Sequence, residues 1–104
     1  MPHLIVSYGH PADPNVFDDY YTTNHRSLVD RIPGIVRWHA GHCASLDDTQ
    51  PEYYLIAVLT FASLGDLQAG MASSEGQAAV ADIPNYATGG ATTTILDDLT
   101  GTSR

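Results

Sequence analysis

Residues Phe17–Ile32 read FDDYYTTNHRSLVDRI, and Pro33 and Gly34 follow at once. In a helix, each residue is rotated by about 100° from the last, so residues three and four apart share a face. One face of this segment carries four apolar or aromatic residues and one histidine: Phe17, Tyr21, His25, Leu28 and Ile32. Charged side chains occupy the opposite face. The pattern therefore predicts an amphipathic helix that ends where Pro33 disfavours helical geometry in the residue before it.

His25 lies on the face that this helix turns toward the core. A buried imidazole without a hydrogen-bond partner costs roughly 1–3 kcal/mol, so His25 needs a polar neighbour or an open cavity. Two interpretations follow: His25 is a satisfied core residue, or it lines a pocket.

The remaining elements can be placed from residue alternation and from breakers. We expect strands at His3–Tyr8, Gly34–Cys43, Tyr53–Phe61 and Thr92–Leu96. A second helix opens with the cap Ser63-x-x-Asp66, breaks near Ser73-Ser74-Glu75-Gly76, starts again at Gln77–Asp82 and ends before Pro84. The order β-α-β-β-α-β is that of a ferredoxin-like α+β fold with an antiparallel sheet, in one domain over residues 1–104.

Finer expectations concern the ends of these elements. Asp13 or Asn15 is expected to cap the first helix. Gly41 suggests a bulge or the fraying end of the second strand, which otherwise places Ile35, Arg37 and His39 on one face. Residues 97–104 are expected to form a polar C-terminal tail.

The segment Tyr53–Phe61, YYLIAVLTF, is apolar or aromatic at nearly every position, which indicates a strand covered on both faces. Two helices in one layer cover only one face of a sheet. In a short chain, the natural cover for the other face is a second copy of the same sheet. We therefore expect a homodimer formed by apposed sheets.

Composition excludes several classes of partner. The chain has 104 residues, 12 acidic and four scattered basic residues. It offers no basic surface for nucleic acid or anionic membranes. Cys43 is the only cysteine, so no internal disulfide can form, and no apolar run is long enough to span a bilayer. These features predict a cytoplasmic protein.

The close spacing of His39, His42 and Cys43 raises the possibility of a metal site. Residues three apart on a strand point to opposite faces, so His39 and His42 converge only if a bulge at Gly41 turns one of them. We therefore expect no metal. No nucleotide-binding, serine-hydrolase or metalloprotease motif is present, and we expect no cofactor.

Aromatic and polar side chains are the remaining candidates for ligand contacts. A small chain with this many phenol hydroxyls near its strand ends is expected to contain a polar-lined cavity for a small hydrophobic molecule. The candidate substrate-binding residues are Tyr8, Tyr21, Trp38, Tyr54, Phe61, Asn85 and Tyr86. Most aromatic residues of this kind serve core packing, so packing is the alternative for each.

Two sequence blocks resemble the EthD family, which is associated with ethyl tert-butyl ether degradation. They are F-x-x-Y-Y-x-x-x-H-x-x-L-V-x-x-I-P-G-I from Phe17, and F-A-S-L-x-x-L-x-A-x-x-x-S-x-E-G-Q-A-A-x-A-D from Phe61, followed by Asn85-Tyr86. The resemblance covers residues 4–96. It implies a ferredoxin-like dimeric α+β barrel with a cavity between the helices and the concave sheet.

The resemblance also implies that His25 faces this cavity, where its near-neutral pKa suits a catalytic proton-transfer group. Relatives on this barrel perform cofactor-free lactone isomerisation, dehydration and quinone-forming oxygenation. We therefore expect a cofactor-independent enzyme that acts on a small hydrophobic or aromatic metabolite. A non-catalytic accessory or small-molecule-binding protein of an oxygenase-dependent ether-degradation pathway is one alternative, and a cofactor-free monooxygenase is another.

Overall fold

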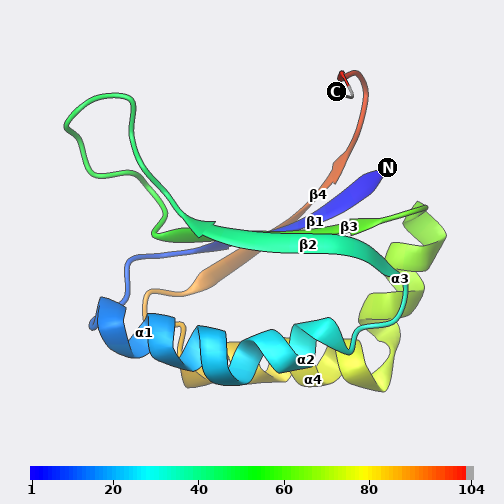
Figure 1. Ribbon diagram of the computed structural model, residues 1–104, viewed down its shortest axis with the longest axis horizontal. Coiled ribbons are helices and arrows are strands. Elements are labelled where there is room, and N and C mark those ends of the chain that lie inside the picture. Colours follow the sequence, from blue (N-terminus) through cyan, green and yellow to red (C-terminus); the bar gives the residue numbers. More distant parts are fainter. Residues whose placement is uncertain (103–104) are drawn as a thin grey trace.

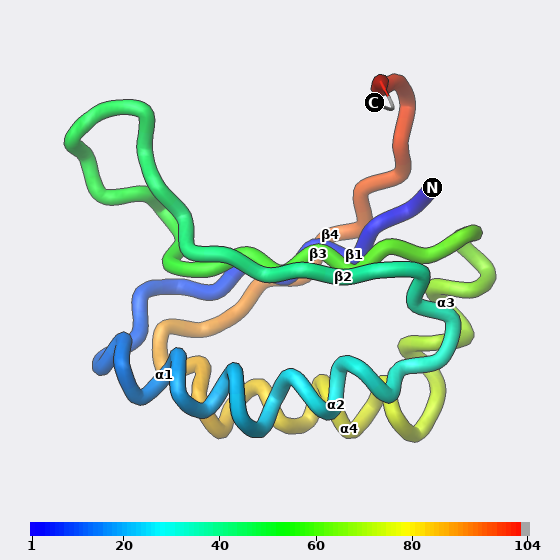
Figure 2. The backbone as a smooth tube through the Cα atoms, in the orientation of Figure 1, coloured from blue at the N-terminus to red at the C-terminus, as the bar shows by residue number. Residues whose placement is uncertain are grey.

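A layer of helices lies against one face of a four-stranded antiparallel sheet, and the other face of the sheet carries no helix (Figures 1 and 2). The computed structural model describes residues 1–102. The elements, in chain order, are β1 (Pro2–Tyr8), α1 (Pro14–Tyr20), the π-helical turn η1 (Tyr21–His25), α2 (Arg26–Asp30), β2 (Ile35–His42), β3 (Leu55–Phe61), α3 (Leu64–Ala72), α4 (Ser74–Asp82), the 3₁₀ turn η2 (Ile83–Asn85) and β4 (Ala91–Asp97). The predicted ferredoxin-like fold is confirmed.

The strands are ordered β2-β3-β1-β4, so β1 and β3 occupy the centre. Within β1, Leu4, Val6 and Tyr8 are buried under the helices, and the residues between them point to the open face. Leu59 and Ile95 flank Leu4 on either side, which fixes the register of three neighbouring strands. We call the helix-free side of the sheet the outer face.

The first helical segment, which runs from α1 through η1 to α2, contains a turn that the sequence pattern did not predict. Asp13 caps α1 by accepting hydrogen bonds from the backbone N–H groups of Asn15 and Val16, so the helix begins at Pro14, before Phe17. Further on, the Arg26 N–H bonds to the Tyr21 carbonyl five residues earlier, as in a π turn.

The π turn keeps residues spaced by four on the buried face. Phe17, Tyr21, His25 and Val29 are all at most 5% exposed. An uninterrupted α-helix would rotate such a series steadily away from the core, whereas the wider turn compensates for this drift. Leu28, predicted on the inward face, is only partly buried against the core, and Val29 is the fully buried residue at this turn.

In β2, the irregularity lies near Val36 and not at Gly41. Ile35 pairs with Phe61, whereas Arg37 already pairs with Thr60, and Gly41 pairs regularly with Ile56. The bulge places Ile35 on the helix side with Trp38 and leaves Arg37 and His39 on the outer face. The predicted grouping of Ile35 with these two residues was therefore wrong.

The other strands differ from prediction at their ends. Strand β3 begins at Leu55, so Tyr53 and Tyr54 precede it. Ile56 and Val58, on its outer face, are only half-buried, so one chain covers just one face of this strand. Asp97 belongs to β4, and residues 103–104 of the predicted tail lie outside the described residues.

The predicted break in the second helix is confirmed: Ser73 ends α3 and caps the start of α4. Its hydroxyl donates to the Gly70 carbonyl at the end of α3 and accepts from the Gly76 N–H in the first turn of α4. Helix α4 therefore begins at Ser74, before Gln77. Among residues 1–102, no helix has the length and apolar character of a membrane span.

Gly76→Ala tests how tightly α3 and α4 meet. A Cβ at Gly76 would collide with the Gly70 carbonyl and lie 2.8 Å from Met71 Cα, and both are backbone atoms that have little freedom to move. We expect a loss of roughly 1–3 kcal/mol in the free energy of unfolding, measured with urea. Gly65→Ala in α3 is the control, since its nearest neighbour would be Ser63 Oγ at 3.8 Å; a Gly76→Ala protein as stable as this control would contradict the packing.

Candidate functional site

A cavity of about 350 Å³ lies between the sheet and the helices. Its wall is largely aliphatic, with residues from β1, β3, β4, α2, α3 and α4. The polar side chains that reach it are Tyr8, Tyr21, His25, Gln68 and Thr93. Since no Asp, Glu, Lys or Arg lines it, the cavity suits an uncharged, mainly apolar molecule.

His25 and Asp82 form a buried pair beside this cavity. His25 Nδ1 lies 3.0 Å from Asp82 Oδ2, and the two residues are 3% and 9% exposed. The π turn presents His25 from the first helical segment, and Asp82 is the last residue of α4. The pair therefore links the two halves of the helix layer beneath the sheet.

Asp82 receives two further hydrogen bonds. The Tyr20 hydroxyl donates to Oδ1 at 2.6 Å, and the Asn85 side-chain amide donates to the same oxygen at 2.9 Å. Burial acts to raise the pKa of Asp82, but the hydrogen bonds from Tyr20, Asn85 and His25 outweigh it and hold that pKa below its usual value. Asp82 is therefore an anion at neutral pH.

This anion fixes the state of the imidazole. An ionised carboxylate can only accept, so Nδ1 of His25 carries the proton of the shared hydrogen bond. Burial lowers the pKa of His25 below its ordinary value, against the opposing effect of the Asp82 hydrogen bond and charge. His25 is thus neutral at pH 7, with the lone pair on Nε2.

His25 Nε2 is accessible. Among residues 1–102, every fully buried side-chain nitrogen or oxygen has a hydrogen-bond partner, whereas Nε2 has none. This atom must therefore keep contact with open space, and its ring lines the cavity. An accessible imidazole lone pair can remove a proton from a molecule bound there.

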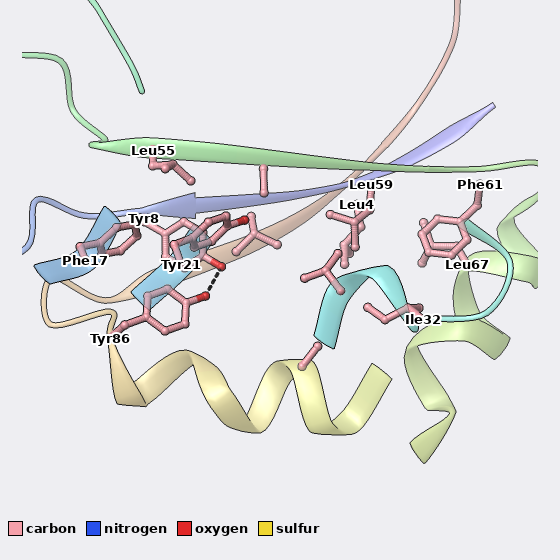
Figure 3. Packing of buried hydrophobic residues seen from close by; sticks show 14 residues of the cluster. Leu4, Tyr8, Phe17, Tyr21, Ile32, Leu55, Leu59, Phe61, Leu67 and Tyr86 are labelled. Carbon is pink, nitrogen blue, oxygen red and sulfur yellow. Dashed lines mark hydrogen bonds between the residues drawn. The ribbon is translucent and has the colours of Figure 1, made fainter. Parts of the chain in front are cut away.

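Three phenols gather at the same end of the core (Figure 3). The Tyr8 and Tyr86 hydroxyls lie 2.7 Å apart and share a hydrogen bond, and the Tyr86 ring centroid is 4.8 Å from that of His25. Burial raises the pKa of Tyr8, Tyr21 and Tyr86, so all three remain protonated at neutral pH. Protonated phenols at a cavity wall can donate hydrogen bonds to a developing oxyanion.

The structure brings some of the predicted site residues together and separates others. Tyr8, Tyr21 and His25 line the cavity, whereas Tyr86 and Asn85 contact Tyr8 and Asp82 behind it. Phe61 is fully buried and lies with Leu67 and Ile32 at the other end of the core (Figure 3). It does not line the cavity.

Trp38 and Tyr54 belong to a different region, between β2 and the first helical segment. The Trp38 indole N–H donates to Asp30 at 2.7 Å, and the Tyr54 hydroxyl donates to Asp18 at 2.8 Å. A second cavity of about 610 Å³ opens here, with Trp38 and Asp18 in its wall. Tyr21 lines both cavities, so it separates them.

The histidines near the end of β2 do not converge. His39 faces outward opposite Val58, whereas His42 pairs with Leu55 on the helix side and bonds to Asp18 at 3.0 Å. Within residues 1–102, no group of three or more His, Cys, Asp or Glu side chains is placed to hold a metal ion.

Sequence reasoning missed Asp82 and Tyr20. A signal for Asp82 was available: it lies three residues after Ala79 and six after Gly76, on the small-residue face with which α4 packs. A carboxylate on a buried helix face, in a chain with an inward histidine, points to a pair between the two. Tyr20 gave no such signal, because it adjoins Tyr21 and only the fold shows which phenol reaches Asp82.

Comparisons with known proteins agree with this architecture. A curated relative, an uncharacterised 11.0 kDa protein from the thcB-thcC intergenic region of Rhodococcus erythropolis, is 43% identical over 100 residues, covering 96% of this chain and 97% of the relative. A crystal structure of an ethyl tert-butyl ether degradation (EthD) family protein from Bacillus halodurans superposes with a TM-score of 0.88 at 26% identity, covering 95% and 99% of the two chains.

Other solved structures share the fold at lower identity. A dimeric ferredoxin-like protein of unknown function from Thermobifida fusca gives a TM-score of 0.68 at 15% identity, covering 91% of this chain and 88% of the other. SnoaB, a cofactor-independent oxygenase from Streptomyces nogalater, gives 0.63 at 12% identity, covering 96% and 93%.

The EthD domain model matches residues 9–90, which include the first helical segment with His25 and the whole of α3 and α4 with Asp82. The chain therefore belongs to the EthD domain family.

Proposed function

We propose that this protein is a cofactor-independent enzyme that removes a proton from a small, uncharged, largely apolar metabolite. The observation that supports this proposal is the His25–Asp82 pair beside a 350 Å³ apolar cavity, with Nε2 of the neutral imidazole left without a hydrogen bond. A core histidine that served packing alone would not need to line a cavity.

In this mechanism, His25 Nε2 takes a proton from a carbon next to a carbonyl group or from a phenol. When the proton leaves carbon, the C–H electron pair forms a C=C bond and the carbonyl π pair moves to oxygen, which gives an enolate. When the proton leaves a phenol, the O–H pair stays on oxygen as a phenolate. Asp82 stabilises the imidazolium that forms, and the phenols of Tyr8 and Tyr21 donate to the substrate oxyanion. Return of the proton to another carbon completes an isomerisation, whereas departure of a leaving group gives an elimination.

The charge of the chain supports an uncharged substrate. Its formal net charge is −8, and the cavity wall offers no cation to hold an anion. The aliphatic wall instead favours a ring or short apolar chain that carries a single carbonyl or hydroxyl group.

A second candidate is cofactor-free oxygenation, which begins with the same deprotonation. SnoaB, a structural neighbour, is a cofactor-independent oxygenase. Oxygen uptake with a phenolic substrate would distinguish this reaction from isomerisation. A non-catalytic binding protein of an ether-degradation pathway would bind such molecules without proton exchange or oxygen uptake.

We also propose that two copies associate through their outer faces. Ile5, Ile56 and Val58 form a half-buried apolar strip at the centre of that face. Of the 12 acidic residues, none occupies a strand position whose side chain points to this face. The strands of two copies of an acidic protein can therefore approach each other there without bringing strand carboxylates together.

The catalytic proposal is tested by hydrogen exchange. We expect the protein to speed α-deuteration of 2-tetralone in D₂O, followed by proton NMR, and His25→Gln to lower this rate by roughly 10²–10⁴-fold through loss of the base. His10→Gln is the matched control, because His10 bonds to the Pro51 carbonyl outside the cavity. Full exchange by a folded His25→Gln protein would refute the role of His25.

The pH dependence of exchange tests Asp82. Since burial lowers the pKa of His25, the rate should fall only as the pH drops below about 6.5, when the base becomes protonated. Asp82 acts to raise this pKa, so in Asp82→Asn we expect the midpoint to move to lower pH and the plateau rate to fall. An unchanged midpoint in a folded Asp82→Asn protein would show that Asp82 does not control the base.

Association is tested by sedimentation at micromolar concentration. We expect the wild-type protein to be a dimer and Val58→Glu to be a monomer, because the substitution places two carboxylates in the proposed interface. Val16→Glu, at an exposed position of α1 on the helix side, should remain a dimer. A monomeric wild-type protein would contradict the proposed association.

A further inference from the structure

Two segments rise from the outer face of the sheet at its opposite ends (Figures 1 and 2). We call residues 43–54, which join β2 to β3, the loop arm, and residues 98–102, which follow β4, the C-terminal arm. The loop arm starts after His42, which pairs with Leu55, whereas the C-terminal arm starts after Asp97, which pairs with Pro2 at the far end of β1.

Hydrogen bonds hold both arms to the sheet. At the loop arm, the Tyr54 N–H donates to the carbonyl of Tyr8 in β1 at 2.8 Å, and His10 Nε2 donates to the Pro51 carbonyl at 2.6 Å. At the C-terminal arm, His3 bridges Thr60 and Asp98 at 2.8 and 2.9 Å. The foot of each arm is therefore held in place by β1 or by the segment that follows it.

Each arm presents a fully exposed leucine. The relative exposure is 111% for Leu46 and 96% for Leu99, the two largest values among the exposed large hydrophobic residues of the described chain. The arms flank the proposed interface, so a second copy on the outer face would lie between them and could bury both leucines.

A hollow of about 430 Å³ lies at the foot of the C-terminal arm. Arg37 and His3 line it together with Asp98 and residues 99–102. Arg37 forms no ion pair within residues 1–102. In the part of the chain that the structure describes, this end of the outer face therefore has an arginine that forms no ion pair, beside Asp98, which is bonded to His3 and the N-terminus.

The loop arm has the opposite charge. It carries Asp47, Asp48 and Glu52 and no Lys or Arg. Face-to-face copies related by a two-fold axis bring the loop arm either to the partner's loop arm or to the partner's C-terminal arm. The first arrangement places six carboxylates together, three from each copy. The second places three carboxylates near Arg37, which forms no ion pair within residues 1–102, and near Asp98, whose carboxylate is already bonded to His3 and to the N-terminal ammonium.

We infer that, in the dimer, the loop arm of each copy lies on the hollow that Arg37 and the C-terminal arm form in the other copy. Unlike arms therefore meet at both ends of the interface. The inference rests on the proposed association through outer faces. It specifies which ends of the two copies meet and which side chains stabilise the contact. Leu46 and Leu99 stabilise it by apolar burial, and Arg37 by its charge.

Cysteine cross-linking tests which ends meet. In a Cys43→Ser background, we expect Leu46→Cys/Leu99→Cys to form a covalent dimer on mild oxidation, and Leu46→Cys alone to form none. The two arms lie at opposite ends of one molecule, so they can be joined only between copies (Figure 1). A covalent dimer from Leu46→Cys alone, at the rate of the double variant, would show that like arms meet and overturn the inference.

The dimer dissociation constant provides a second readout. Leu46→Ser should raise it roughly ten-fold or more, since the substitution removes a buried leucine from each copy. Val16→Ser, exposed on the helix side, should leave it unchanged. If the wild-type protein is a dimer and the dissociation constants of Leu46→Ser and Val16→Ser are equal, the proposed contact between unlike arms is wrong, whereas the association through outer faces stands. A monomeric wild-type protein would contradict both proposals.

Discussion

The hydrogen bond between His25 and Asp82 is the constraint on which the rest of the structure depends. It joins the end of the π turn to the end of α4 at a depth where neither group could remain without a partner. Tyr20 and Asn85 complete the shell around Asp82, so the carboxylate is held by three donors from both halves of the helix layer. The bond thus fixes the spacing of the helices, the tautomer of the imidazole and the position of Nε2 at once.

This constraint accounts for the form of the cavity. The first helical segment must turn His25 toward α4 while Phe17, Tyr21 and Val29 stay buried, and the π turn makes both possible. The aromatic cluster of Tyr8, Tyr21 and Tyr86 fills one end of the core, and Leu67, Phe61 and Ile32 fill the other (Figure 3). The space between them is bounded mainly by aliphatic side chains, with His25, two phenols, Gln68 and Thr93 as its polar lining, a distribution that fits the proposed deprotonation of an apolar compound.

The sequence predicted the fold well and the site in part. Alternation and breakers located all four strands, both helical segments and the break at Ser73, because these depend on local chemistry. The inward position of His25 followed from the same periodicity. The π turn was missed because no glycine or proline lies within it, and the bulge at Val36 was missed because Pro33 and Gly34 just before it also fit an ordinary turn between helix and strand. The grouping of aromatic residues required the tertiary structure: Phe61, Tyr54 and Trp38 are as aromatic as Tyr8, yet the fold places them elsewhere.

The state of the His25 ring tests the central claim most directly. Nitrogen-15 NMR of the imidazole, followed through a pH titration, reports both the tautomer and the pKa of this residue. The structure predicts a proton on Nδ1, an unprotonated Nε2 at pH 7 and a midpoint below the ordinary histidine value of about 6.5. A ring protonated at Nε2, or a midpoint above 6.5, would contradict a free base facing the cavity.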